Sequence, residues 1–286
     1  MDRVAGVGFP IWQCGRFSLT LERPLVMGIL NVTPDSFSDG GRYLARDAAL
    51  HHAEQMLAAG VDIIDVGGES TRPGAPPLPV DEELERVTQL IDELRDAGVA
   101  ISVDTYKPAV MREALAHGAD IVNDIWAFRQ PGAIEAVAGA SCGLCAMHMM
   151  GDPLTMQSDP ASAYDDVVED VRHFLAQRVD ALEAAGVDRT RIVVDPGFGF
   201  GKTVEQNYRL LARLAQTAPP GLPVLAGVSR KSMLGAVTNK PAAGRVAASV
   251  AGAVCAAERG AAIVRVHDVA ETVDALRVWQ AVRHAG

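Results

Sequence analysis

Short apolar runs alternate with stretches of helical spacing eight times between Leu25 and the end of the chain. Most of the helical stretches close at a glycine, a common helix C-terminus. Alternating strands and helices imply right-handed βαβ units and a parallel sheet. Eight such units in roughly 260 residues match the size of a (β/α)8 barrel. The pattern therefore predicts an α/β TIM barrel. A doubly wound open sheet is the alternative, because sequence alone does not show that the sheet closes.

The expected strands are Leu25–Leu30, Val61–Val66, Ala100–Val103, Ile121–Val122, Leu144–Met147, Ile192–Val194, Pro223–Val228 and Ile263–His267. The expected helices are Asp47–Ala59, Asp81–Ala97, Pro108–His117, Ala133–Ala140, Ala161–Ala185, Val204–Gln216, Arg245–Arg259 and Val269–Arg283. Upstream, Phe17–Leu21 alternates in polarity after a turn at Gly15, which predicts a short β-hairpin. The chain is therefore expected to combine an N-terminal hairpin extension, residues 1–24, with a barrel domain, residues 25–286.

The composition of the 286-residue chain limits its partners. A formal net charge of −10 argues against binding nucleic acid through a basic surface. No apolar run reaches membrane-spanning length, and the N-terminus lacks the apolar core of a signal peptide, so a cytoplasmic protein is expected. Cys142 and Cys145 have CxxC spacing, but no second pair or neighbouring histidine completes a metal set. Buried free thiols are therefore expected at these positions.

Polar side chains follow most of the expected strands at the point where each strand ends. In a barrel these ends open at one mouth, so the side chains would face one pocket. Burying many polar groups is costly without a partner, which indicates a pocket for a polar ligand. Contact with water would explain one or two of these positions, but it poorly explains acids and carboxamides at nearly every end. The residues are Asn31, Asp104, Asn123, His148, Asp195, Ser229, Arg265 and His267.

The stretch Ile192–Lys202 shows this arrangement most clearly. A run of β-branched residues ends in Asp195 and a proline, and the glycines that follow let the backbone turn sharply beside a ligand. A strand and turn with an incidental acid is the alternative. The segment is not a P-loop, because only three residues separate Gly197 from Gly201–Lys202–Thr203. It also lacks the spacing of the dinucleotide-binding fingerprint.

Two loops and a set of cations add to the predicted mouth. Asn31–Gly41 and Ser70–Gly74 are rich in hydroxyl groups, acids and glycines, and they are expected to be mobile loops after the first two strands. A local positive set inside an acidic protein suits phosphate or diphosphate. Its members are Arg72, Lys231, Arg265 and His267.

Five motifs, in one order, resemble those of the dihydropteroate synthases. The first two resemble the signatures of the wider pterin-binding family, and the last two favour the synthase branch. The resemblance covers nearly the whole chain after the hairpin, although Ala75–Pro79 is richer in proline than the common pattern. The motifs are Met27–Gly41, Asp65–Gly74, Asp195–Lys202, Ser229–Ser232 and Arg265–Asp268.

The resemblance implies a TIM-barrel transferase of folate biosynthesis that forms a homodimer. Such an enzyme condenses 6-hydroxymethyl-7,8-dihydropterin diphosphate with 4-aminobenzoate. The products are 7,8-dihydropteroate and diphosphate, and Mg²⁺ is required. Its partners are these small molecules, with no nucleic acid and no membrane.

The resemblance also implies roles for individual residues. The pterin would be held by Thr71, Asp104, Asn123, Met147, Asp195, Lys231 and Arg265. The diphosphate would be faced by Asn31, Thr71, Arg72, Arg265 and His267, with Asn31 also holding the metal. Aminobenzoate would approach Thr71, Phe200, Lys231 and Ser232. The residues expected to take part in catalysis are Asn31, Asp35, Arg72, Lys231, Arg265 and His267.

The chemistry of these residue types agrees with the implied reaction. A pterin edge offers a ring N–H and an amine, a donor pair that suits Asp195, while Asn123 matches a mixed edge. The leaving group is highly charged, so Mg²⁺ and cations should stabilise its departure. No Ser–His–Asp order or activated cysteine is evident, so no covalent enzyme intermediate is expected. The resemblance favours a dissociative substitution at the pterin methylene.

Two alternatives remain at this point. A methyltransferase-type barrel that binds a methylated folate would share the pterin pocket but would not need Arg72 and the Arg265/His267 pair. A non-catalytic pterin-binding paralogue would not need the loop residues Asn31 and Asp35, which are intact. Both features favour the synthase.

Overall fold

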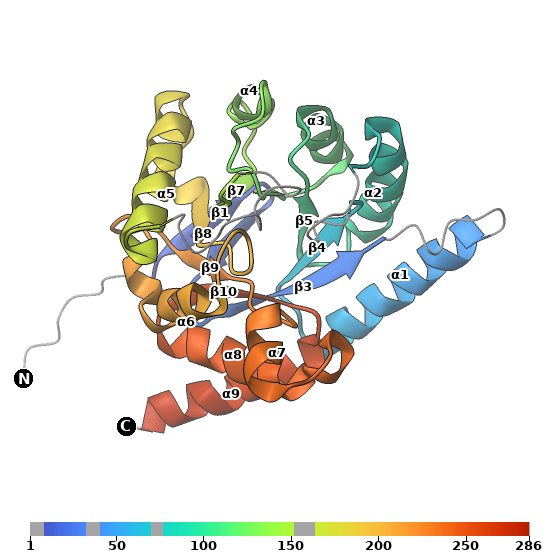
Figure 1. Cartoon of the computed structure of the whole chain (residues 1–286). Helices are drawn as coiled ribbons and strands as arrows, with labels where there is room; N and C mark the ends of the chain where they lie inside the picture. Colours follow the sequence, from blue (N-terminus) through green and yellow to red (C-terminus); the bar gives the residue numbers. More distant parts are fainter. Residues whose placement is uncertain (1–8, 33–40, 70–76, 152–163, 286) are drawn as a thin grey trace, which may run out of the picture.

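The structure is a computed structural model that describes residues 9–32, 41–69, 77–151 and 164–285, without the side chains of residues 41–45. Its main strands are β3 (Leu25–Asn31), β4 (Ile63–Gly67), β5 (Ala100–Asp104), β6 (Ile121–Asp124), β7 (Gly143–Met147), β8 (Ile192–Asp195), β9 (Val224–Ala226) and β10 (Ala261–Val266). They form a closed barrel in the order β10-β3-β4-β5-β6-β7-β8-β9 (Figure 1). The predicted TIM barrel is confirmed. The open doubly wound sheet is wrong, because β10 pairs in parallel with both β3 and β9.

Helices follow the strands and surround the barrel (Figure 1). They are α1 (Gly41–Ala59), α2 (Val80–Leu94), α3 (Pro108–His117), α4 (Ala133–Val137), α5 (Val167–Ala184), α6 (Val204–Ala212), α7 (Ser232–Thr238), α8 (Val246–Glu258) and α9 (Val269–Ala285). The sequence did not predict α7, because its seven residues are too few to show a helical period. The helix expected to reach Gln216 ends at Ala212, and a 3-10 turn follows.

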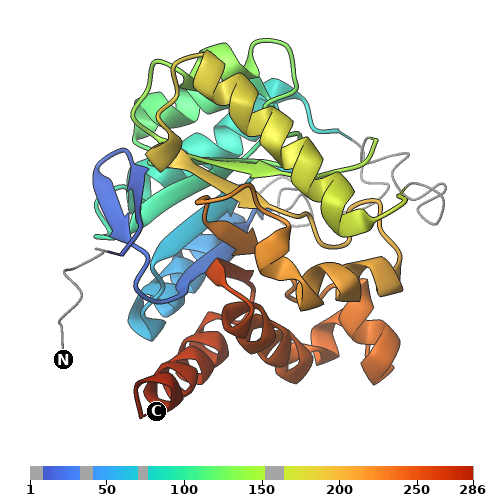
Figure 2. The ribbon, with the colours of Figure 1, turned by 90° about the vertical axis from the view of Figure 1, so that its left-hand side faces the viewer.

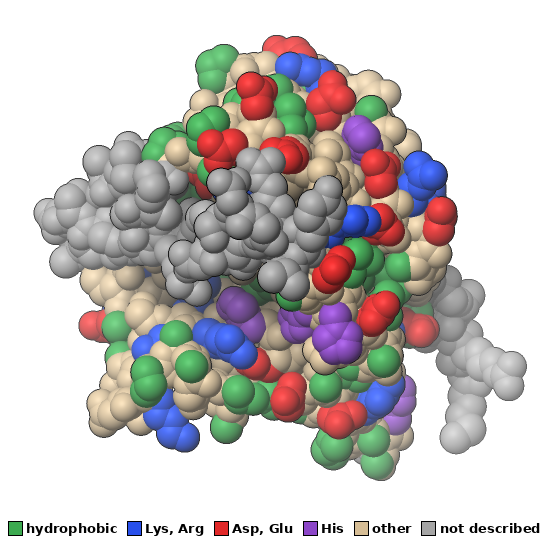
Figure 3. Space-filling view, turned by 90° about the vertical axis from the view of Figure 1, so that its right-hand side faces the viewer, with side chains coloured by type: hydrophobic (Ala, Val, Ile, Leu, Met, Phe, Trp, Pro, Cys, Tyr) green, Lys and Arg blue, Asp and Glu red, His purple; other side chains and the backbone are tan. Residues whose placement is uncertain are grey.

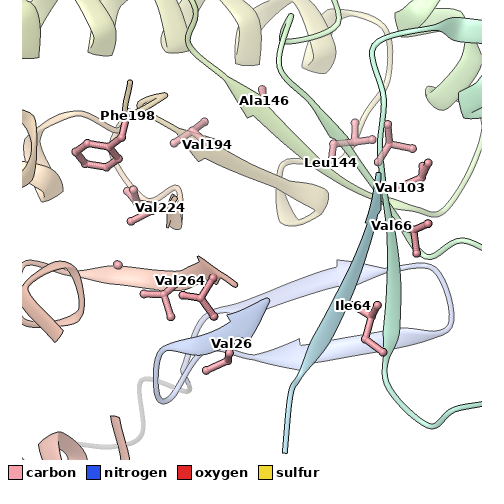
Figure 4. Packing of buried hydrophobic residues seen from close by; sticks show 14 of the residues in the cluster. Val26, Ile64, Val66, Val103, Leu144, Ala146, Val194, Phe198, Val224 and Val264 are labelled. Carbon is pink, nitrogen blue, oxygen red and sulfur yellow. The ribbon is translucent and has the colours of Figure 1, made fainter. Parts of the chain in front are cut away.

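Side chains alternate between the two faces of each barrel strand, and this alternation divides the core. The outward set packs in one cluster with apolar residues of the helices. Figure 4 shows Val26, Ile64 and Val103 among the members of this cluster. The inward set near the amino ends of the strands is apolar: Leu25, Met27, Ile63, Ala100, Ile121, Cys145, Val193, Leu225 and Ile263. Inward positions nearer the carboxyl ends carry polar groups instead. The barrel is therefore dry at one end and polar at the other.

The predicted hairpin is present as β1 (Ile11–Cys14) and β2 (Phe17–Thr20), and it lies beside the barrel in Figure 2. Trp12 and Cys14 are fully buried against the apolar inward set. A Cβ on Gly143 would lie 2.6 Å from Cys14 Sγ and 3.1 Å from the Trp12 ring, so glycine at the start of β7 lets the hairpin approach. Trp12 Nε1 donates to the carbonyl of Arg191 at 2.8 Å. The hairpin thus closes the apolar end of the barrel.

Trp12→Ala is expected to lower the free energy of unfolding by about 3–5 kcal/mol, because it opens a cavity beneath the barrel and leaves the Arg191 carbonyl unpaired. Urea denaturation measures the change. Ile11→Ala, in the same strand but 46% exposed, is the matched control and should cost less than about 1 kcal/mol. A loss below about 1 kcal/mol for Trp12→Ala, as for the control, would show that Trp12 does not stabilise the barrel.

The cysteines Cys14, Cys142 and Cys145 are buried free thiols, as expected for the CxxC pair. Burial raises the pKa of Cys142 and Cys145, so both stay protonated at neutral pH. Within the described residues, no group of three or more His, Cys, Asp or Glu is arranged to hold a metal ion. None of the described helices is both long and apolar enough to cross a membrane.

Candidate active site

Inward positions near the carboxyl ends of five strands bring five polar side chains together. Arg265 of β10 donates from Nε to Asp65 of β4 at 2.6 Å and from Nη2 to Asp104 of β5 at 2.7 Å. Asn123 of β6 donates to Asp65 at 3.2 Å. Asp195 ends β8 and is 5% exposed. We call these five residues the polar cluster; it contains three acids, one carboxamide and one guanidinium.

The polar cluster borders a space that a side chain would otherwise fill. Gly227 follows β9, and a Cβ there would lie 3.9 Å from Oδ2 of Asp195 and 4.0 Å from Cβ of Arg265. Oδ1 of Asp195 already accepts a hydrogen bond of 2.7 Å from the backbone N–H of Gly197. One carboxylate oxygen therefore holds the loop after β8, and the other borders the space beside Gly227.

Three buried oxygens at this end of the barrel have no hydrogen-bond partner among the described residues. They are Asp65 Oδ1, Asp104 Oδ1 and Ser102 Oγ. An unpaired buried oxygen costs free energy, and a ligand that donates a hydrogen bond removes that cost. The site is therefore suited to a ligand rich in N–H donors.

Burial also perturbs the acids of the polar cluster. It raises the pKa of Asp104 to about 7, while the charge of Arg265 opposes the shift and that of Asp65 adds to it. Burial raises the pKa of Asp195 as well, against the hydrogen bond from Gly197. The acids are thus costly to keep charged in the free protein, and a donor or cation from a ligand would stabilise their carboxylate forms.

A lysine and an apolar wall flank the polar cluster. Nζ of Lys231 lies 4.3 Å from the centroid of the Phe200 ring, within cation–π distance. Burial, together with the charge of Arg265, lowers the pKa of Lys231 to about 8. Phe200 belongs to a buried apolar cluster with Ile125, Met147 and Met149. The site therefore offers a flat apolar surface beside its hydrogen-bonding groups.

His267 differs from its predicted state. Its Nδ1 lies 3.0 Å from Oγ of Ser229, and burial together with the charge of Arg265 lowers its pKa to about 4. It is therefore a neutral imidazole at pH 7 and not a member of a positive set. Arg265 keeps its charge but is already paired with two acids. Two members of the expected positive set, Arg265 and His267, therefore offer no uncompensated charge in the free protein.

The structure also corrects the place of His148. Met147 and His148 are consecutive, so their side chains leave the chain in opposite directions. Met147 packs in the apolar wall, whereas the ring of His148 lies 4.8 Å from that of Phe174 in α5. His148 therefore lies between the barrel and α5 and does not line the mouth.

The remaining predicted residues divide into two groups. Asn31 at the end of β3 and Ser232 at the start of α7 are exposed. Asp35, Thr71 and Arg72 lie outside the described residues. Asp65 was not predicted from the sequence as a site residue, although it lies two positions after Ile63, a member of the inward set, and so faces the same way.

Comparison with known proteins decides the family. The chain is 51% identical to the dihydropteroate synthase of Escherichia coli (strain K12) over 269 residues, which are 94% of this chain and 95% of that protein. Residues 27–267 match the family model described as "Pterin binding enzyme". The chain belongs to this family, as a dihydropteroate synthase. It is therefore a transferase, and the predicted resemblance is confirmed over the methyltransferase-type barrel.

Solved structures of other dihydropteroate synthases agree. The Burkholderia cenocepacia enzyme complexed with 7,8-dihydropteroate is 63% identical, with a TM-score of 0.89 over 97% of this chain and 98% of that chain. The Xanthomonas albilineans enzyme with 4-aminobenzoic acid is 51% identical, with a TM-score of 0.89 over 96% of this chain and 98% of that chain. Synthases of the same fold thus bind a pterin product and an aminobenzoate.

Proposed function

We propose the roles that these side chains take in condensing 6-hydroxymethyl-7,8-dihydropterin diphosphate with 4-aminobenzoate. The observation that carries the proposal is the polar cluster, in which Asp65 and Asp104 each keep an unpaired oxygen and Oδ2 of Asp195 borders the space beside Gly227. A pterin edge presents a ring N–H and an exocyclic amine, and a carboxylate accepts both. Asp195 is assigned to this donor pair and Asn123 to the mixed edge. The rest of the proposed pterin-binding set is Thr71, Asp104, Met147, Lys231 and Arg265.

The aminobenzoate is assigned to the side of the site that Phe200 and Lys231 form. The Phe200 ring supplies an apolar face for the benzene ring, and the Lys231 ammonium lies 4.3 Å from its centroid. Ser232 offers an exposed hydroxyl next to Lys231. Thr71 completes the proposed set on the strength of the family resemblance.

The diphosphate is assigned to Asn31, Thr71, Arg72, Arg265 and His267. The bond between the pterin methylene and the diphosphate oxygen breaks with its electron pair passing to the diphosphate. The aminobenzoate nitrogen then bonds to the methylene and loses a proton. Groups that stabilise the departing charge accelerate this step, and no nucleophile of the protein is needed. His267 is neutral before the substrate binds, and an adjacent anion raises the pKa of its imidazole.

Mg²⁺ is the proposed cofactor, with Asn31 as its protein ligand. Mg²⁺ is usually bound by one or two protein oxygens together with substrate phosphates and water. The exposed carboxamide of Asn31 at the end of β3 provides one such oxygen. When bound, the ion stabilises negative charge on the leaving diphosphate. Asp35 and Lys231 complete the proposed catalytic set of Asn31, Arg72, Arg265 and His267.

Turnover is expected to fall by at least about 100-fold in EDTA and to return with Mg²⁺, because the leaving charge is then uncompensated. The assay follows release of diphosphate and formation of dihydropteroate from the two substrates. Asn31→Ala should raise the Mg²⁺ concentration needed for half-maximal turnover, while Asn31→Asp, which keeps an oxygen ligand, should not. Full turnover without divalent metal would contradict the metal proposal, and no dihydropteroate under any condition would contradict the functional one.

A homodimer is supported by apolar side chains on outer helices: Val237, Val278 and Val282 are each more than half exposed. Sedimentation equilibrium would measure whether the protein is a monomer or a dimer in solution.

On the face that Figure 3 shows, acidic and basic side chains are mixed over the described atoms, which supports small molecules rather than nucleic acid as partners. Buried free thiols support a cytoplasmic location. The division at residues 1–24 and 25–286 stays a prediction.

A further inference from the structure

Lys202 is 4% exposed, although its side chain carries an ammonium group. Its Nζ lies 2.9 Å from the carbonyl oxygen of Gly197, 3.0 Å from that of Phe200 and 3.0 Å from Nδ1 of His148. An ammonium has three N–H donors, and each of these atoms is an acceptor for one of them. Lys202 therefore binds the loop after β8 from its inner side, in the interior of the protein.

The Gly197–Phe200 segment that Lys202 holds lies between two groups of the proposed site. At its first end, the N–H of Gly197 donates to Asp195. Gly197 also packs so tightly that an added Cβ would lie 1.8 Å from the carbonyl oxygen of His148. At its other end, the ring of Phe200 lies under the ammonium of Lys231. Gly197 is thus held by packing as well as by Lys202. Phe200, at the other end of the segment, presents its ring to the site.

His148 completes the arrangement from outside the barrel. Its ring is 3% exposed and packs against Phe174 and Tyr164. Burial, and then the charge of Lys202, lower the pKa of His148 well below its usual range, so the imidazole is neutral. A neutral imidazole accepts at Nδ1 when its proton is on Nε2. His148, which the strand pattern predicted to face the mouth, instead serves as an acceptor for Lys202.

We propose that Lys202 is a positioning residue for the aminobenzoate half of the reaction, acting by fixing Phe200 and, through its ring, Lys231. Burying an ammonium is costly, and a methionine would occupy similar space without that cost. Burial lowers the pKa of Lys202 to about 7, while the charge of Asp195 opposes the shift. The three acceptors around Nζ favour the ammonium form and give a reason for a lysine at this position. The inference rests on the proposed assignment of Phe200 and Lys231 to aminobenzoate.

The test compares Lys202→Met with Lys240→Met, which changes an exposed lysine on the surface. KM is measured for each substrate. kcat is expressed per folded enzyme, with the folded fraction taken from thermal unfolding. Lys202→Met should raise KM for aminobenzoate by about 10- to 100-fold, because a small misplacement of a binding group has effects of that size. KM for the pterin diphosphate should change much less than KM for aminobenzoate, since packing still holds Gly197 beside Asp195 and Lys231 is one of several groups assigned to the pterin. Lys240→Met should match the wild type.

His148→Phe provides a second measurement, which also serves if Lys202→Met does not fold. It removes one acceptor of Lys202, so it should raise KM for aminobenzoate in the same direction but by a smaller factor. In the double variant the two effects on KM should not multiply, because both act through one contact.

Phe200→Ala distinguishes the role of Lys202 from the assignment of Phe200 to aminobenzoate. If it raises KM for aminobenzoate while Lys202→Met and His148→Phe leave it unchanged, the role of Lys202 is wrong and that of Phe200 stands. If it leaves KM unchanged, the assignment of Phe200 is itself wrong.

Discussion

Asp195→Asn is expected to lower the affinity of the synthase for a pterin by about 30- to 1,000-fold, which corresponds to about 2–4 kcal/mol. The variant keeps Oδ1 for the N–H of Gly197, so the loop after β8 stays in place. It replaces Oδ2, which borders the Gly227 space, with an NH₂ group. A donor then meets the donor edge of the pterin, and a charged hydrogen bond is lost as well.

Calorimetric titration with a pterin measures this effect. Asp180→Asn, an exposed acid on α5, is the matched control and should bind the pterin as tightly as the wild type. Thermal unfolding of both variants checks that the barrel is intact. Wild-type affinity in Asp195→Asn would show that this carboxylate does not receive the pterin edge.

Arg265→Met is expected to lower the free energy of unfolding by about 3–5 kcal/mol at pH 8, because Asp65 and Asp104 remain buried without their cation. This loss of stability should depend on pH.

The pKa of Asp104 is already raised to about 7 in the presence of Arg265, and removing the guanidinium raises it further. The unfolded acid titrates near its usual value of about 4, so above that pH the folded state binds more protons than the unfolded state. Stability therefore falls as pH rises, and the deficit of the variant should be small near pH 5 and largest near pH 8.

Urea unfolding of wild type and variant across that pH range measures the deficit. Arg277→Met removes an exposed arginine that is paired with Asp274 in its own helix, and it should cost no more than about 0.5 kcal/mol at any pH. A deficit for Arg265→Met that is constant from pH 5 to pH 8 would show that the guanidinium acts through packing alone and does not compensate the two acids.

Several features of this synthase follow from the sequence because they depend on local spacing. The alternation of apolar runs and helical stretches is set by the periods of the two structures, so it predicts the barrel. The end of an apolar run marks the end of a strand, and this placed Asp104, Asn123, Asp195 and Arg265 at one mouth. The family motifs added the reaction, which comparison with related synthases confirms.

Other features were decided only by the tertiary structure, because they depend on parity and on contacts between distant segments. The end of the apolar run does not show which of Met147 and His148 faces the barrel. In the structure Met147 faces the barrel and His148 faces α5. Asp65 and Arg265 are 200 residues apart, and only barrel closure brings them into contact. That contact compensates the charge of Arg265, and burial keeps His267 neutral, so neither adds the free positive charge that the sequence suggested. The partners of Lys202 likewise become visible only when the loop after β8 folds back over its own lysine.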